Sequence, residues 1–211
     1  MNTLAITATA TLVLAASLAA CNRGAGEVKT ETHQVGAFTR IEVGGGIGLT
    51  VRIGSAQPVE VQAQENILPL IVAEVQDGTL RIRSTEAYTT SQPVHATVVT
   101  PSLAGVTLSG GSQGTIDGLT VDTFTADLSG GSAVTAAGSA STITLHLSGG
   151  SRANLKDLSA KIVAADMSGG STATVSASSE VNGSASGGSH LTVVGSAKLN
   201  VQTSGGSAVT K

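Results

Sequence analysis

The chain has 211 residues, enough for one domain of ordinary size or for one elongated repeat domain. Its formal net charge is -3 and only 12% of its residues are charged, which argues against nucleic acid as a partner. Aromatic residues make up 1% and glycine supplies 27 positions, so the composition excludes a compact core of large side chains. Abundant small and β-branched residues argue against disorder and favour narrow, regularly turned β-structure.

The N-terminal segment has the pattern of a bacterial export signal. Residues 4–20 carry no charge and are dominated by Ala, Leu, Thr and Ile, and the segment ends in Leu18-Ala19-Ala20-Cys21. This ending resembles a bacterial lipobox, which implies a signal peptide over residues 1–20, cleavage before Cys21, and lipidation of its thiol and new amino group. The alternative is a transmembrane helix, but the segment is marginal for crossing a hydrocarbon core ~30 Å thick. The first three residues lack Lys and Arg, which departs from the usual export signal.

Cys21 is the only cysteine in the sequence, so no intrachain disulfide can form, and we predict that it is the lipid-attachment residue. More than one acyl chain gives stable anchoring, so we expect an exported protein held at the cell envelope. Asn22 follows the cysteine, where Asp would signal inner-membrane retention by enterobacterial sorting rules, and in a Gram-negative cell this favours the outer membrane. Residues 21–34 are polar and have no apolar period, which predicts a flexible tether.

The domain that follows, residues 35–211, begins with irregular coils over residues 35–104. Apolar and polar residues alternate over 47–53, which predicts a strand with one buried face. Asp77-Gly78 stands between two apolar runs and predicts a tight hairpin. Another strand is expected over residues 94–100, closed by a proline. These segments predict β-structure without an obvious repeat.

Residues 105–211 repeat the motif Ser-Gly-Gly-Ser. Its six copies begin at Ser109, Ser129, Ser148, Ser168, Ser186 and Ser204. The spacing of 18 to 20 residues is typical of a solenoid, in which stacked repeats bury a face that one repeat cannot bury alone. Glycine suits a sharp corner because it tolerates positive φ, and the serines are expected either to hydrogen-bond neighbouring backbone or to stack in ladders. A flexible linker is excluded because alternating apolar strands flank every motif, so we predict an all-β parallel β-helix with about 18-20 residues per coil.

Aligning the copies on the motif separates inward from outward positions, because side chains alternate along a strand. The inward columns before the motif are Leu108, Leu128, Leu147, Met167, Ala185 and Thr203, then Val106, Ala126, Leu145, Ala165, Gly183 and Val201, then Ala104, Phe124, Ile143, Val163, Val181 and Leu199. An outward column after the motif holds Thr115, Thr135, Asn154, Thr174, Thr192 and Thr210. Aligned threonines on a flat solenoid can order water or bind ice, but one per coil is more simply a β-favouring surface residue.

The order of these elements carries a family resemblance. The relevant segments are Phe38-Thr39-Arg40-Ile41, Gly44 to Val51, Asp77-Gly78-Thr79-Leu80-Arg81-Ile82, Pro101-Ser102-Leu103, and then the repeated Gly/Ser corners. Over residues 35–211 the chain resembles the bacterial family called "putative auto-transporter adhesin, head GIN domain", from which it departs in the doubled glycine of every corner. The resemblance implies a right-handed parallel β-helix, a cell-envelope location and no established catalysis.

One outward column could carry chemistry. Two residues before each motif stand Thr107, Asp127, His146, Asp166, Ser184 and Gln202. Asp127, His146 and Asp166 fall on consecutive coils, which suggests either a metal or acid–base cluster or a solvated ladder. We favour the ladder, because an outward sheet offers no cleft and catalysis needs a concave site. No catalytic, cofactor-binding or metal residue is therefore assigned, and no cofactor is expected.

Catalysis on polysaccharides is the remaining enzymatic possibility for a β-helix, and it needs clustered charges and aromatic rings. The repeat region has isolated Arg152, Lys156, Lys161 and Lys198 instead. We therefore expect a non-catalytic envelope lipoprotein, a structural or interaction module with adhesion as its candidate role. The alternatives are a glycan- or polymer-binding module and, remotely, a polysaccharide-active enzyme. Expected partners are the membrane, an envelope or surface protein or glycan, and a second copy paired end to end.

Overall fold

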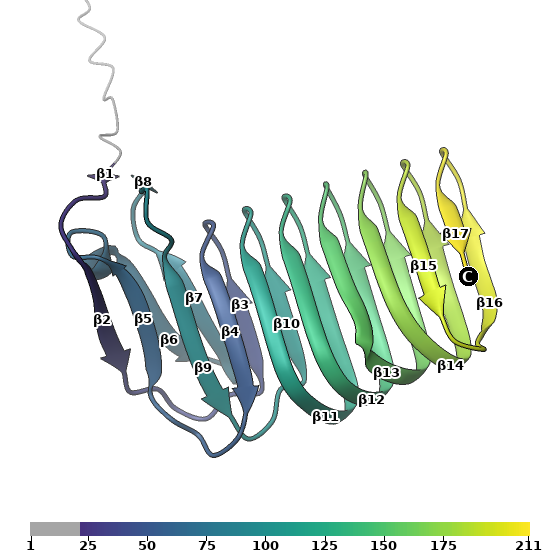
Figure 1. Ribbon diagram of the computed structural model, residues 1–211, viewed down its shortest axis with the longest axis horizontal. Helices are drawn as coiled ribbons and strands as arrows, with labels where there is room; N and C mark the ends of the chain where they lie inside the picture. The colour runs from purple at the N-terminus through teal and green to yellow at the C-terminus, as the bar shows by residue number, and fades with distance from the viewer. Residues whose placement is uncertain (1–21) are drawn as a thin grey trace, which may run out of the picture.

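The computed structural model describes residues 22–211 and shows a parallel β-solenoid whose coils stack along one long axis (Figure 1). The predicted all-β solenoid is therefore confirmed. The predicted signal peptide over residues 1–20 and the predicted lipid-attachment residue Cys21 lie outside the described residues.

Each long strand of the regular coils belongs to both faces of the solenoid. The first half of β11 pairs with β4 (Gly48–Ile53), and its second half pairs with β10. Neighbouring coils are parallel, and Ala126, Leu145 and Ala165 stand side by side, which confirms the alignment on the motif. The strands of these coils are β10 (Gly105–Leu108), β11 (Gln113–Leu128), β12 (Ala133–Leu147), β13 (Arg152–Met167), β14 (Thr172–Ala185), β15 (His190–Val194), β16 (Lys198–Thr203) and β17 (Ala208–Thr210).

The N-terminal segments continue the same two faces. On one face β3 (Arg40–Val43) lies between β10 and β7 (Thr79–Ser84). On the other, β4 lies between β11 and β9 (His95–Thr100). The predicted hairpin is confirmed, because β6 (Ile71–Gln76) pairs antiparallel with β7 through Asp77 and Gly78, both of positive φ as a type I′ turn requires. A short 3₁₀ turn, η1 (Leu68–Leu70), precedes it.

The prediction of a flexible tether over residues 21–34 is wrong for the part that the structure describes. Residues Asn22–Arg23 form β1, which pairs with β8 (Tyr88–Thr89), and Val28–His33 form β2. Strand β2 pairs antiparallel with β5 (Val59–Gln64), which itself pairs antiparallel with β9. Its side chains are mostly exposed, so backbone hydrogen bonds hold it and no apolar period marks it in the sequence. It covers an edge that would otherwise present unpaired backbone.

The predicted inward columns form the core. All their members from Leu108 to Ala185 are buried except Gly183, and Phe124 is the bulkiest of the fully buried side chains. At the far end Thr203 is exposed, because no described residue stacks on the last coil. The outer edges of β16 and β17 pair with nothing among residues 22–211. End-to-end pairing of two copies therefore stays a prediction.

In five of the six motifs the last serine closes its corner from inside, whereas the buried hydroxyl of Ser171 has no hydrogen-bond partner among the described residues. Five such hydroxyls donate a hydrogen bond to the carbonyl of the first serine of the same motif at 2.8 to 2.9 Å; they belong to Ser112, Ser132, Ser151, Ser189 and Ser207. Ser132 also donates to the carbonyl of Leu108 in the preceding coil, at 2.9 Å. The predicted role of the serines as backbone partners is thus confirmed, and the motif builds a corner.

Candidate functional site

A row of polar side chains crosses one face of the solenoid, one per coil. Strand pairing places Asp127 beside His146 and His146 beside Asp166, so the predicted stack of these three residues is confirmed. The row extends further than the sequence indicated, because Thr107 pairs with Glu42 and Glu42 pairs with Arg81. We call this row the polar ladder; in spatial order it is Arg81, Glu42, Thr107, Asp127, His146, Asp166, Ser184 and Gln202.

The centre of the polar ladder is solvated. His146 Nδ1 lies 4.0 Å from Asp166 Oδ2, and the two side chains are 52% and 58% exposed. The Ser184 hydroxyl donates to Asp166 Oδ1 at 2.8 Å. Within residues 22–211 no group of three or more His, Cys, Asp or Glu side chains is arranged to hold a metal ion. The geometry therefore offers hydrogen-bonding groups to a ligand and not a preformed metal centre.

This face is not flat, and the hollows on it are shallow and open to solvent. One hollow of about 380 Å³ follows the ladder past Asp127, His146 and Asp166. A second hollow, of about 620 Å³, lies between Arg81, Arg83 and the loop after β7, and Ser109 also lines it. The two hollows border neighbouring strands, because Glu42 of the larger hollow pairs with Thr107 of the smaller one. We call the combined depression the corner groove, because the Ser-Gly-Gly-Ser corners border it.

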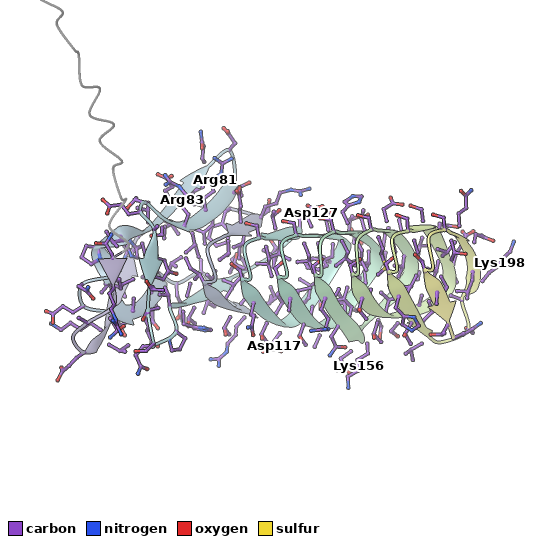
Figure 2. The ribbon with its side chains drawn as sticks, turned by 90° about the horizontal axis from the view of Figure 1, so that it is seen from above. Arg81, Arg83, Asp117, Asp127, Lys156 and Lys198 are labelled. Carbon is purple, nitrogen blue, oxygen red and sulfur yellow. The ribbon has the colours of Figure 1, made fainter. Side chains whose placement is uncertain are left out.

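The β6–β7 hairpin forms one wall of the corner groove. Figure 2 shows Arg81 and Arg83 projecting from the same side of the solenoid as Asp127, opposite Asp117 and Lys156. Arg81 Nε lies 3.2 Å from a Glu42 carboxylate oxygen, and Arg83 Nη2 lies 3.2 Å from Glu74 Oε1. Each guanidinium thus has an acidic partner, and this wall presents balanced charge.

Tyr88 supplies an aromatic ring at this end of the corner groove. Its hydroxyl donates a hydrogen bond to the backbone carbonyl of Gly45 at 3.0 Å, and burial raises the pKa of the phenol. The pairing of β8 with β1 holds it in place. Sequence reasoning missed this residue because no apolar alternation marks residues 84–93, and the strand that pairs with β8 begins at Asn22.

The raised pKa of Tyr88 predicts a measurable loss of stability at high pH. Because the folded chain holds the phenolic proton more tightly, this contribution is fully present below the ordinary pKa of 10.0 and is lost as pH rises through the folded pKa. Tyr88 is the only tyrosine, so tyrosinate absorbance reports on it alone. We expect a higher titration midpoint in buffer than in denaturing urea; equal midpoints would contradict the prediction.

The opposite face carries the predicted threonine column, lengthened by two coils. Thr115 pairs with Thr50, and Thr50 pairs with Thr97. Thr50 Oγ1 lies 3.0 Å from His95 Nε2, and burial lowers the pKa of that imidazole. The column holds at most one threonine per coil, with Asn154 in place of a threonine in one of them, and beside Thr115 and His95 it borders a hollow of about 260 Å³. The corner groove is therefore the stronger candidate site.

Comparison with known proteins gives one family and a set of similar folds. The family model described as "Putative auto-transporter adhesin, head GIN domain" matches residues 37–197. No curated protein matches the chain. A crystal structure of a putative adhesin from Bacteroides fragilis superposes with a TM-score of 0.69 at 18% identity, covering 89% of this chain and 98% of that one.

Two further solved structures share the fold at lower similarity. A putative lipid binding protein from Parabacteroides distasonis has a TM-score of 0.56 at 15% identity, covering 90% of this chain and 98% of that one. A putative adhesin from Parabacteroides merdae has a TM-score of 0.53 at 13% identity, covering 89% and 97%. At these identities the likeness extends to the solenoid and not to any ligand.

Proposed function

This chain belongs to the family described as "Putative auto-transporter adhesin, head GIN domain", and on that premise we propose that it is a non-catalytic interaction module of the bacterial cell envelope. The observation that carries the proposal is the corner groove. It runs across stacked coils and takes polar ladder side chains from Arg81 to Ser184. Extended surfaces of this kind are what solenoid proteins use to bind partners.

A non-catalytic role is supported by the exposure of the candidate acid–base groups. Catalysis depends on preorganised groups in a site from which water is excluded. Asp166 and His146 are more than half exposed, and Asp166 accepts a hydrogen bond from the hydroxyl of Ser184. The polysaccharide-active alternative has a direct test, because product released from any polysaccharide in a panel would overturn the non-catalytic proposal.

We propose that a lipid on Cys21 holds the module at the membrane, with the outer membrane as its location. The sequence Leu18-Ala19-Ala20-Cys21 supports this. No helix within residues 22–211 is long and apolar enough to cross a membrane. Because β1 begins at Asn22 and pairs with β8, a lipid on the preceding residue would hold the Tyr88 end of the corner groove close to the membrane.

Replacing the cysteine tests the anchor. We expect the Cys21→Ser chain to move from the membrane fraction to the soluble fraction, because the thiol that accepts the lipid is gone. Ser17→Ala, which leaves the lipobox intact, is the matched control and should stay with the membrane. Fractionation of cells followed by detergent phase separation measures both. A Cys21→Ser chain that remains in the detergent phase would contradict lipid anchoring at this residue.

The interaction role is tested with the full chain carried on vesicles by its own lipid. The vesicles are presented to arrays of extracellular-matrix proteins and of glycans, with protein-free vesicles as the control. Retention on a defined class of array element supports an interaction module. Absence of retention on both arrays, with the protein folded on the vesicles, would overturn the proposed function.

A further inference from the structure

The corner groove repeats its hydrogen-bonding groups at the spacing of the coils. Neighbouring strands lie roughly 4.8 Å apart, so the polar ladder presents one polar side chain at each such step along the solenoid axis. Asp127, His146 and Asp166 are three successive steps. A ligand that matches this pattern is a linear polymer lying across the strands, with polar groups on every repeating unit.

The chemistry of the corner groove excludes several kinds of polymer. The exposed large apolar residues among residues 22–211 are Val28, Ile162 and Val194, and none of them lines the groove, which disfavours an acyl chain. Carboxylates of the ladder repel phosphates, which disfavours nucleic acid. An extended peptide binds by adding a strand to a sheet edge, whereas the backbone beneath the groove is already paired on both sides.

The groups that remain suit sugar hydroxyls. Carboxylates such as Asp127 and Asp166 accept hydrogen bonds from hydroxyls, and such charge-assisted bonds are stronger than neutral ones. Ser109 and Ser184 can donate or accept. At the wider hollow the ring of Tyr88 is fixed by the bond from its hydroxyl to Gly45, so it offers a rigid apolar face. The C–H face of a sugar ring packs on such a surface while its rim hydroxyls reach polar neighbours.

We propose that the corner groove binds a neutral glycan strand along the solenoid axis, with one sugar ring packed against Tyr88. The proposal rests on the proposed interaction function and names its ligand class and site. A neutral strand is expected over a polyuronate, because Glu42, Asp127 and Asp166 would repel carboxylated sugars, while Arg81 already has Glu42 as its partner.

The probes are neutral oligosaccharides, namely gluco-, manno- and chito-oligosaccharides, with oligogalacturonate as the acidic comparison. Binding is measured by calorimetry on the full chain in detergent. Tyr88 fluorescence provides a second signal, since the sequence has no tryptophan and no other tyrosine. We expect at least one neutral series to bind, with affinity rising with chain length and with a change in tyrosine emission. Oligogalacturonate is expected to bind more weakly.

Variants locate the site. Tyr88→Ala is expected to weaken binding about tenfold or more, the scale of a lost aromatic contact, while Tyr88→Phe keeps the ring and most of the affinity. Asp166→Ala, on the exposed ladder, is a second variant whose folding does not depend on β8, and it should also weaken binding. Asp117→Ala, on the opposite side of the solenoid, is the matched control and should bind like the native chain.

Three results would overturn the inference. The first is that the native chain binds no neutral glycan. The second is that the affinity is unchanged in both Tyr88→Ala and Asp166→Ala. The third is that the native chain binds oligogalacturonate more tightly than the neutral glycans. If any of these occurs while lipid-carried protein is still retained on the protein arrays, the glycan inference fails and the proposed interaction function stands. If retention on every array is absent too, both fail. Binding to phospholipid vesicles by the Cys21→Ser chain, with no glycan binding, would likewise replace the glycan by a lipid surface.

Discussion

Replacing Phe124 with alanine is expected to lower the free energy of unfolding by about 3–5 kcal/mol, the range for losing a buried aromatic side chain. Phe124 is 0% exposed and is the bulkiest fully buried residue of the described chain. Its neighbour in the next coil is Ile143, to which it is tied by the parallel strand pairing. Because backbone hydrogen bonds hold this strand in register with both adjacent coils, the coil cannot collapse fully around the cavity.

The matched control for Phe124→Ala is Ile162→Ala. Ile162 lies in a long strand two coils away, and it points outward with 39% of its surface exposed. Its replacement should change stability by no more than about 0.5 kcal/mol, as is usual for surface substitutions. Urea denaturation followed by far-ultraviolet circular dichroism measures both variants. Equal losses of stability in the two variants would show that Phe124 contributes no more to core packing than an exposed side chain does.

Replacing Gly169 with alanine is the second large effect, with an expected loss of about 1–3 kcal/mol from local strain. Gly169 is the first glycine of its corner and has a φ of +69°. A Cβ there would lie 2.9 Å from the backbone nitrogen of Gly149, the corresponding glycine of the preceding coil. The two corners stack so closely that neither corner can move away without breaking the strand pairing beside it.

Gly170 offers a control in the same corner. Its φ is not in the positive range, and a Cβ at this position would meet no atom within 4 Å. Gly170→Ala is therefore expected to be neutral or to stabilise by up to about 1 kcal/mol, because alanine restricts the unfolded chain. Thermal unfolding of the two variants gives the comparison. A Gly170→Ala loss as large as that of Gly169→Ala would show that the stacking of first glycines is not the cause.

The inward and outward positions of the regular coils were predictable because the signals are local. Residues such as Leu128, Leu147 and Met167 precede identical motifs, and side chains alternate from there with period two. The stack of Asp127, His146 and Asp166 follows from the same alignment. A shift by one residue would turn the apolar columns to solvent, so burial leaves a single register.

The tether over residues 21–34 was mispredicted because side-chain pattern does not record backbone pairing. Strand β2 exposes most of its side chains and contributes little to the core. Its partner β5 lies about thirty residues further along the chain, beyond the reach of any local signal. An edge that needs covering is visible only once the strands on either side have been placed.

The sequence by itself therefore determined the solenoid, its corners and the orientation of its repeated side chains, since each depends on neighbours within one coil. Only the tertiary structure decided where the N-terminal segments join it. That placement sets Arg81 beside Glu42 and brings Tyr88 to Gly45, which lies 43 residues away in the chain. These contacts form one end of the corner groove. They arise from backbone pairing between distant strands, which the pattern of residues alone does not specify.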